Sequence, residues 1–348
     1  MFVHDAQPMR VVFGAGAVDR VAEETDRLGL RRVLVLSTPR QGALAARVTA
    51  LLGGRAAGTF DGARMHVPVT SVAAAEAAVA ATGADGCLAI GGGSTIGLAK
   101  ALSLRLGLPS VVVPTTYAGS EMTPIWGLTE DGRKTTGRDP VVLPRAVVYD
   151  PDLTHALPAA VSGPSGLNAI AHAVEALYAP DGTPVVSALA ERGVRDLASA
   201  LPVVVADGTD ADARSRALEG AWLCGACLGA TTMGLHHKLC HALGGMLDLP
   251  HAETHAIVLP HVAAYNLPVV PEADAVLRRA LDTDDVAAAL RDLARQVGVP
   301  DGLRALGVDH ADLARVVDEV LAAPYRNPRA PTRGDLETLL EAAWRGGS

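Results

Sequence analysis

The stretch LAIGGGSTIGLAKAL, residues 88–102, decides the fold of this chain. It begins with an apolar run typical of a buried strand, passes through Gly91, Gly92 and Gly93, and continues in an Ala- and Leu-rich pattern with helical spacing. Glycines let the backbone approach a ligand closely, and the N-terminal end of a helix attracts negative charge. The stretch therefore predicts a phosphate-binding turn after a buried strand, although it lacks the GxGxxG pattern of ordinary dinucleotide-binding folds.

Strands and helices alternate around this turn over about the first 150 residues. This alternation predicts an α/β fold with a parallel sheet that is covered by helices on both faces. A ligand is then expected at the carboxyl ends of the strands. Further strands are predicted at 31–37, 109–116 and 145–150, and helices at 42–52, 72–82 and 95–106.

Helical spacing dominates after Pro151, with few strand-like runs. Turn-forming residues crowd the segment DPDLTHALPAAVSGPSG, residues 150–166, which predicts a domain boundary there. We therefore predict an α/β cofactor-binding domain over residues 1–157 and an all-helical substrate and catalytic domain over residues 158–348, with a cleft between them. The clearest predicted helices of the second domain are 167–178, 185–201, 213–228 and 286–297.

The composition excludes some classes of function. The chain has 348 residues and a formal net charge of −8, so it lacks the basic surface that nucleic acids attract. No signal peptide and no membrane-spanning segment is expected, which predicts a cytoplasmic protein. Its four cysteines are predicted to be buried, unpaired thiols in a reducing compartment. An anionic substrate would need local cations to offset the general negative field.

Small and hydroxyl-bearing residues follow three of the predicted strands, at the same edge of the sheet as the glycine turn. Such residues can hold the ribose or the nicotinamide of a dinucleotide. The acidic residue that usually excludes a 2′-phosphate is absent there and Arg40 is present, so NADH and NADPH are both expected as cofactors. The predicted cofactor-binding residues are Ser37, Thr38, Pro39, Gly91, Gly92, Gly93, Ser94, Thr95, Thr115, Thr116 and Ser120.

Histidines are concentrated in the second domain, at helical spacing. Asn168, His172 and Glu175 fall at i, i+4 and i+7 of one predicted helix and so share one face. A single buried histidine is usually a satisfied core residue, whereas several at helical spacing indicate a metal-binding or proton-transfer site. The pattern continues with His237 and His241, one turn apart, and with His251 at the start of the next predicted helix.

Four motifs carry a resemblance to a known family: GGGST, PTT followed by GSE, NAxxHAxEA, and HxxxH followed by another histidine after nine intervening residues. Together they resemble the iron-containing alcohol dehydrogenase superfamily, whose fold is shared with dehydroquinate synthase. KTTGRD, MGLHHKLCHALGG and LPHAETHA are most similar to the maleylacetate reductases of this superfamily, and similar blocks run from about Val11 to Asn327. The resemblance implies a homodimer that uses NADH or NADPH and whose substrate is a small dicarboxylate.

The resemblance also implies the reaction. Maleylacetate reductases reduce the conjugated C=C bond of maleylacetate to give 3-oxoadipate, in the degradation of aromatic compounds of the hydroxyquinol and chlorocatechol type. Hydride adds to the alkene carbon β to the ketone, charge collects on the ketone oxygen, and a proton completes the adjacent carbon. Because this charge is delocalised as an enolate, hydrogen bonds and cationic side chains can stabilise it without a metal ion.

In the metal-dependent members of the superfamily, an Asp and three His residues bind the ion. The matching positions are Asn168, His172, His237 and His251. Asn168 is a neutral amide in place of the carboxylate, which weakens the attraction for a divalent ion. Maleylacetate reductases resemble this chain at that position and work without metal, so no metal is expected. If a metal is present, these four residues are the expected ligands.

The expected roles of the site residues follow from this chemistry. His237 and His241 are expected to donate the proton and to stabilise the enolate, with the order between them open. Lys134 lies where the superfamily contacts cofactor or substrate, so it is expected to serve both, whereas Lys100 is expected to be a solvated surface charge. The predicted catalytic residues are His172, His237, His241, His251 and Lys134, and the predicted substrate-binding residues are Asn168, Lys238, Arg138, Tyr117 and Tyr325.

Three alternatives remain open at this level. The chain could be a metal-dependent alcohol or polyol dehydrogenase that tolerates Asn168 as a weak ligand. It could reduce another unsaturated keto acid on the same scaffold. It could also be a non-catalytic relative that acts as a binding protein, although the glycine turn and the histidines that such a relative would lose are intact.

Overall fold

A computed structural model describes residues 2–347 and divides the chain into two compact units. Residues 6–157 form an α/β unit, and the chain from Pro158 onward forms a helical unit. The short N-terminal segment up to Asp5 belongs with the helical unit, where the His4 Nδ1 lies 3.2 Å from the Thr183 hydroxyl. The prediction that residues 2–5 belong to the α/β domain was therefore wrong.

The α/β unit contains a six-stranded sheet in the order β1-β8-β5-β4-β2-β3. Every neighbouring pair in this sheet is parallel, as the strand–helix alternation predicts. The α/β class of this unit is thereby confirmed. The strands are β1 (Arg10–Phe13), β2 (Val33–Leu36), β3 (Ala56–Phe60), β4 (Gly86–Gly91), β5 (Ser110–Pro114) and β8 (Ala146–Tyr149).

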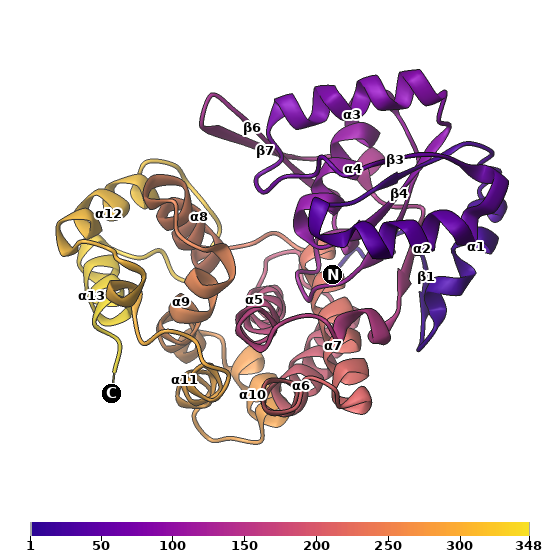
Figure 1. Cartoon of the computed structure of the whole chain (residues 1–348). Helices are drawn as coiled ribbons and strands as arrows, with labels where there is room; N and C mark the ends of the chain where they lie inside the picture. The colour runs from indigo at the N-terminus through magenta and orange to yellow at the C-terminus, as the bar shows by residue number, and fades with distance from the viewer. Residues whose placement is uncertain (1, 348) are drawn as a thin grey trace. The chain divides into compact units, whose positions relative to one another are not determined.

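Helices cover both faces of this sheet (Figure 1). Successive side chains of a strand point to opposite faces, so Val33 and Val35 of β2 pack on one side while Leu34 and Leu36 pack on the other. α1 and α2 cover the first face, and α3 and α4 cover the second. The helices are α1 (Val21–Arg27), α2 (Gly42–Leu52), α3 (Val69–Thr82) and α4 (Gly93–Leu106).

The chain reverses its winding direction between β2 and β4. It leaves β2 through α2 on one face of the sheet and leaves β4 through α4 on the other face. Because the two connections turn away from each other, the carboxyl ends of these two neighbouring strands border a crevice. The fold therefore places the residues after β2 and the glycine turn after β4 side by side.

A separate hairpin pairs β6 (Ile125–Glu130) with β7 (Arg133–Arg138) in antiparallel register. The sequence analysis did not predict these strands. Asp131 and Gly132, with φ of +48° and +74°, form the two-residue turn between them. An Asp-Gly pair is favoured at such a turn because both positions need positive φ, so this dipeptide could have indicated the hairpin.

Lys100 on α4 is buried, with 1% of its surface exposed, so its prediction as a solvated surface charge was wrong. Its Nζ donates hydrogen bonds to the carbonyl oxygens of Ser120 (2.6 Å) and Ile125 (2.7 Å) and to the hydroxyl of Thr123 (2.9 Å). The helical pattern of the sequence shows which face Lys100 occupies but not that a later loop folds over that face. Lys100 therefore joins α4 to the segment between β5 and β6.

The helical unit is built around α5 (Ala159–Leu177), which packs against α6, α7 and α9 (Figure 1). Fifteen consecutive residues of α5 are buried, from Ser162 to Ala176, so this helix is central rather than peripheral. The all-helical class predicted for this unit is confirmed. The other helices are α6 (Pro184–Ala206), α7 (Ala211–Ala230), α8 (Leu235–Leu247), α9 (His251–Asn266), α10 (Pro271–Leu281), α11 (Val286–Gln296), α12 (Leu313–Leu321) and α13 (Arg333–Arg345).

Among residues 2–347, no helix combines the length and the apolar character that crossing a lipid bilayer requires.

Replacing Lys100 with methionine is expected to change how stability depends on pH. Burial lowers the pKa of Lys100 to about 7, with Glu121 opposing the shift and Arg138 adding to it. Between pH about 7 and about 10.4, Lys100 is protonated in the unfolded chain but not in the folded chain. The unfolding free energy of the wild type should therefore rise with pH relative to Lys100→Met, by about 1.4 kcal/mol per pH unit above pH 7.

Urea unfolding of both proteins from pH about 6 to about 9 measures this difference, because the other titrating groups are common to both. Two curves that stay parallel throughout this range would show that Lys100 keeps its proton in the folded chain.

Candidate active site

In the glycine turn after β4, Gly91 lies close to neighbouring side chains, whereas Gly93 faces open space. Gly91 has φ of +148°, and a Cβ placed there would lie 2.6 Å from the Gln41 Oε1 and the Thr95 Oγ1. A Cβ on Gly93, the first residue of α4, would meet nothing within 4 Å. The turn therefore needs glycine at 91 for its own geometry and leaves the amino end of α4 open to a ligand.

A hydrogen-bonded chain joins the ends of β2 and β5 beside this turn. The Thr38 hydroxyl donates to the Gln41 Oε1 (3.2 Å), and the Gln41 Nε2 donates to the Thr115 hydroxyl (3.1 Å). The hydroxyls of Thr95 and Thr116 are buried and have no hydrogen-bond partner within the part of the chain that the structure describes. Buried hydroxyls without partners are suited to binding the polar groups of a ligand.

The structure thus brings together the predicted cofactor residues that follow β2, β4 and β5. It adds Gln41, which the sequence analysis missed although it lies two residues after Pro39 at the end of a predicted strand. Ser120 stands apart from this group in its contacts, because its carbonyl and hydroxyl oxygens face the Lys100 Nζ. Tyr117, predicted to bind substrate, is fully buried within the α/β unit.

Lys134 and Arg138, the predicted cations of the α/β unit, both lie on β7 of the hairpin. They are exposed, and they are paired in register with Thr129 and Ile125 of β6. Since side chains alternate along a strand, Lys134 and Arg138 point to the same face of the hairpin.

Glu175 is the organising residue of the helical unit. It lies on α5 with 1% of its surface exposed. One oxygen, Oε1, accepts a hydrogen bond from the His236 N–H (2.8 Å), and the other, Oε2, accepts from the Gly234 N–H (2.9 Å) and from the His237 Nδ1 (2.7 Å). Burial alone would raise the pKa of Glu175, but the hydrogen bond from His237, together with the other donors, lowers it to about 2. The carboxylate is therefore ionised.

The first N–H groups of α8 are satisfied by side chains from distant segments. The first turn of a helix leaves these donors without partners in the helix itself. Glu175 accepts those of Gly234, His236 and, at 3.3 Å, His237, while the Asn327 Oδ1 accepts that of Leu235 at 3.4 Å. A negative charge is also favoured at this end of a helix by the helix dipole.

Glu175 sets the orientation of the His237 ring. An ionised carboxylate only accepts hydrogen bonds, so the His237 Nδ1 must carry the hydrogen. In the neutral ring, the Nε2 then has a free electron pair, and this atom is buried without a partner among residues 2–347. His237 can therefore take up a proton at its Nε2, and Glu175 would balance the resulting charge, as the carboxylate does in a catalytic triad.

Two of the other predicted histidines, His172 and His241, lie beside the His237 ring. The ring of His172 on α5 stacks on it with a centroid distance of 5.2 Å, and the ring of His241 lies 6.1 Å away, edge-on. Burial, with the neighbouring histidines, lowers the pKa of His172 well below its ordinary value, so this ring is neutral. His241 and His251 are exposed on α8 and α9. The helical spacing in the sequence thus did predict a real cluster.

The three histidines at the superfamily's metal positions are not gathered as closely as the ligands of a bound ion. Among the described residues, no ligand nitrogens of His172, His237 and His251 lie within 4.8 Å of one another as a group of three. Asn168 contributes only a neutral amide oxygen, which is buried and has no partner among residues 2–347. A neutral amide attracts a divalent ion less strongly than a carboxylate does.

The C-terminal loop and Lys238 complete the surroundings of α8. Lys238 is half-buried on α8. The Tyr325 hydroxyl is buried without a partner within residues 2–347, and burial, with smaller effects of Tyr265 and Glu175, raises the pKa of Tyr325 to about 12. The adjoining Arg326 lines a cavity of about 170 Å³ together with Glu175. The side-chain amides of Asn266 and Asn327 pair reciprocally at 2.8 and 3.0 Å, a contact that the sequence analysis missed.

Comparison with known proteins agrees with this architecture. The sequence-family model of the iron-containing alcohol dehydrogenases matches residues 8–151. A second family model, for the C-terminal part of the Fe-containing alcohol dehydrogenases, matches residues 163–344. A maleylacetate reductase of Sphingobium indicum is 57% identical over 99% of this chain and 98% of its own. Maleylacetate reductase 1 of Cupriavidus pinatubonensis is 55% identical over the same shares. The resemblance inferred from the motifs is confirmed.

Solved structures agree as well. The crystal structure of maleylacetate reductase from Agrobacterium tumefaciens matches with a TM-score of 0.96 and 50% identity over 99% of this chain and 98% of its own. That of the enzyme from Rhizobium sp. matches with the same TM-score, identity and coverage.

Replacing Glu175 with glutamine is expected to destabilise the helical unit. The amide keeps one acceptor oxygen but loses the charge, so donors on α8 and the His237 ring lose their partner. The unfolding free energy at neutral pH should fall by roughly 3 kcal/mol, measured by urea denaturation. The wild-type advantage should also vanish as the pH falls from about 4.5 toward 2, because the folded carboxylate is then protonated.

Glu219→Gln is the matched control. Glu219 lies in the same unit, is only partly buried, and pairs with the exposed Arg192 at 3.5 Å. Its replacement should cost less than about 0.5 kcal/mol. Equal losses in the two variants would contradict the capping role of Glu175.

Proposed function

The chain belongs to the iron-containing alcohol dehydrogenase family of oxidoreductases, and from this we propose that it reduces the conjugated C=C bond of maleylacetate to give 3-oxoadipate, with NADH or NADPH. The observation that carries the proposal is the identity of 57% and 55%, over 99% of this chain, with relatives named maleylacetate reductases. Asn168 at the first metal position supports the same substrate, since conjugate reduction places less demand on a metal ion than carbonyl reduction does.

The open glycine turn supports binding of the coenzyme. The amino end of α4, the free space at Gly93 and the unpartnered hydroxyls of Thr95 and Thr116 match the needs of a pyrophosphate and the adjoining ribose. When bound, a reduced nicotinamide coenzyme supplies the hydride. The remaining catalytic work falls to the residues of the chain.

His237 is the residue best arranged to deliver the proton. Glu175 holds its Nδ1–H and balances the charge of the protonated ring, so the Nε2 can carry a proton and give it to the carbon next to the ketone. His241, one turn along α8, then hydrogen-bonds the enolate oxygen, where charge collects. His172 is held neutral by burial, so it acts as a packing and hydrogen-bonding partner rather than as an acid.

The substrate carries two carboxylates, and the chain carries a net charge of −8, so local cations must bind it. Lys134 and Arg138 on the hairpin, and Lys238 on α8, are the proposed cations. Tyr325 and Asn168 are proposed to donate hydrogen bonds to the substrate or its enolate. In this arrangement catalysis needs no metal ion, because the enolate is stabilised by hydrogen bonds and cationic side chains.

We further propose that the enzyme works as a homodimer in the cytoplasm. Buried free thiols support a reducing compartment: Cys87, Cys224, Cys227 and Cys240 are all buried and unpaired.

The test is to assay EDTA-treated protein with maleylacetate and to follow the absorbance of NADH and of NADPH, with and without added Zn²⁺ or Fe²⁺. Rapid coenzyme oxidation without metal, giving 3-oxoadipate, is expected. Turnover that appears only after metal is restored would overturn the metal-free mechanism and favour a metal-dependent dehydrogenase. No turnover of maleylacetate under any condition would move the substrate to another unsaturated keto acid.

Substitutions in the glycine turn separate its structural and coenzyme-binding roles. Gly93→Ala should leave the unfolding free energy nearly unchanged, because its Cβ meets open space, but should raise the KM for the coenzyme about tenfold, since the methyl group narrows the phosphate site. Gly91→Ala should lower the unfolding free energy by roughly 1–3 kcal/mol, because φ is +148° and the Cβ would lie 2.6 Å from two oxygens. An unchanged coenzyme KM in Gly93→Ala would contradict the proposed phosphate site.

A further inference from the structure

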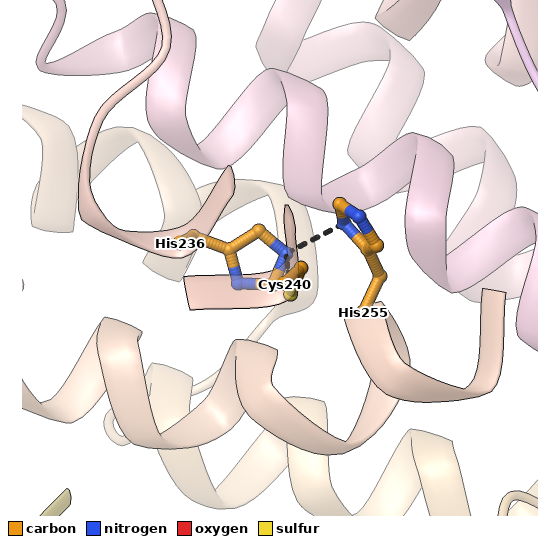
Figure 2. Close-up of side chains that lie close together, drawn as sticks. All are labelled: His236, Cys240 and His255. Carbon is orange, nitrogen blue, oxygen red and sulfur yellow. Dashed lines mark hydrogen bonds between the residues drawn. The ribbon is translucent and has the colours of Figure 1, made fainter. Parts of the chain in front are cut away.

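A second group of possible ligands lies within the helical unit, outside the four superfamily metal positions. His236 and Cys240 lie one turn apart on α8, and His255 lies on α9. Figure 2 shows the three side chains converging, with the hydrogen bond between the two imidazoles drawn as a dashed line. None of the three has more than 2% of its surface exposed. This cluster has no role in the proposed reduction.

The distances within the cluster match those between the ligands of a tetrahedral zinc ion. With Zn–N bonds of about 2.05 Å and a Zn–S bond of about 2.3 Å, two ligand nitrogens lie about 3.3 Å apart, and a nitrogen and a sulfur about 3.6 Å apart. The His236 Nε2 lies 3.0 Å from the His255 Nδ1 and 3.7 Å from the Cys240 Sγ. One ligand atom from each residue lies within 4.8 Å of the other two.

The chemistry of the donors and the local charge also favour zinc. Two imidazoles and a thiolate form a mixed nitrogen and sulfur set, which zinc prefers, whereas magnesium and calcium prefer oxygen. A divalent ion buried here would be balanced by two negative charges. One is the Cys240 thiolate, and the other is the Glu175 carboxylate, whose Oε1 lies 2.8 Å from the His236 N–H.

The histidine pair leaves one nitrogen of each ring outside the contact between the rings. The His236 Nδ1 and the His255 Nε2 are both buried and have no hydrogen-bond partner within the part of the chain described. Neither atom belongs to the proposed ligand set, so both can carry the ring hydrogens when the His236 Nε2 and the His255 Nδ1 bind an ion.

We propose that His236, Cys240 and His255 form a zinc-binding site, separate from Asn168, His172, His237 and His251. On binding, the His236 Nε2 and the His255 Nδ1 each give an electron pair to the ion. The hydrogen that one of these nitrogens carries in the bond between the rings moves to the other nitrogen of the same ring, and the Cys240 thiol releases its proton to solvent. The ion replaces the hydrogen bond between the two imidazoles. It ties α8 to α9 and stabilises the folded chain by mass action.

Cobalt(II) is the probe for this site, because Co²⁺ takes zinc's place in such sites and absorbs light. The full-length, EDTA-treated protein is titrated with Co²⁺. We expect a thiolate-to-cobalt charge-transfer band in the near ultraviolet that saturates at one ion per chain and disappears when Zn²⁺ is added. The superfamily positions contain no sulfur, so an ion bound there cannot produce this band.

Three variants locate the ion. Cys240→Ser should abolish the band. Cys227→Ser is the matched control, because Cys227 is equally buried in the helical unit but its Sγ faces the Val186 carbonyl, and it should retain the band. His172→Ala, which removes one superfamily ligand, should also retain it. Absence of the band in the wild type, or its persistence in Cys240→Ser, would overturn the proposal.

A measurement on the wild type keeps the proposal testable if Cys240→Ser fails to fold. X-ray absorption at the zinc edge of the zinc-loaded protein should show one sulfur and at least two nitrogen neighbours, and a shell without sulfur would overturn the site. Both readouts are spectroscopic and do not depend on turnover, so their result is independent of the reaction proposed above.

Discussion

The carboxylate of Glu175 meets the amino end of α8, where backbone N–H groups and the His237 Nδ1 converge on its two oxygens. Burying a carboxylate is costly unless hydrogen bonds replace its lost water. Here four donors from the amino end of α8 hydrogen-bond to the Glu175 carboxylate, and the helix dipole further stabilises its negative charge. The interaction fixes α8 against α5, and it fixes the tautomer of the histidine at the centre of the cluster.

In the α/β unit, the buried Lys100 donates hydrogen bonds to the backbone, whereas Glu175 in the helical unit accepts them. Lys100 donates to carbonyl oxygens of Ser120 and of Ile125 at the start of β6, whereas Glu175 accepts from N–H groups at the amino end of α8. In each case an ionisable side chain on a helix satisfies the backbone of a distant segment. Each unit therefore depends on a polar contact that an apolar side chain could not replace, because the backbone groups would then be buried without partners.

Asn168 places a neutral amide on the buried helix α5, which also carries His172 and Glu175. A carboxylate there would add a second buried negative charge to the same helix, which is costly without a cation to balance it. The amide avoids this cost and keeps a hydrogen-bonding group on the same face as His172. The buried part of α5 thus carries an ionised carboxylate at Glu175 and a neutral amide at Asn168.

The sequence by itself determined the elements and their order. Hydrophobic periodicity is a local property, so the strands at 33–36 and 86–91, the helix at 42–52 and the helical character after Pro151 could all be read from it. The histidine cluster was also predicted, because spacing along a helix sets which residues share a face. The glycine turn was predicted for the same reason, since glycines between a strand and a helix act locally.

Only the tertiary structure decided which distant groups meet. The burial of Lys100, the capping of α8 by Glu175 and Asn327, and the meeting of Cys240 with His255 each join segments that no local pattern relates. The packing of whole helices determines which group a polar side chain contacts, and the neighbouring sequence does not predict that group. Local sequence therefore predicts the helices and strands of this chain. Which partners its charged and ligand side chains meet is decided only when those elements pack together.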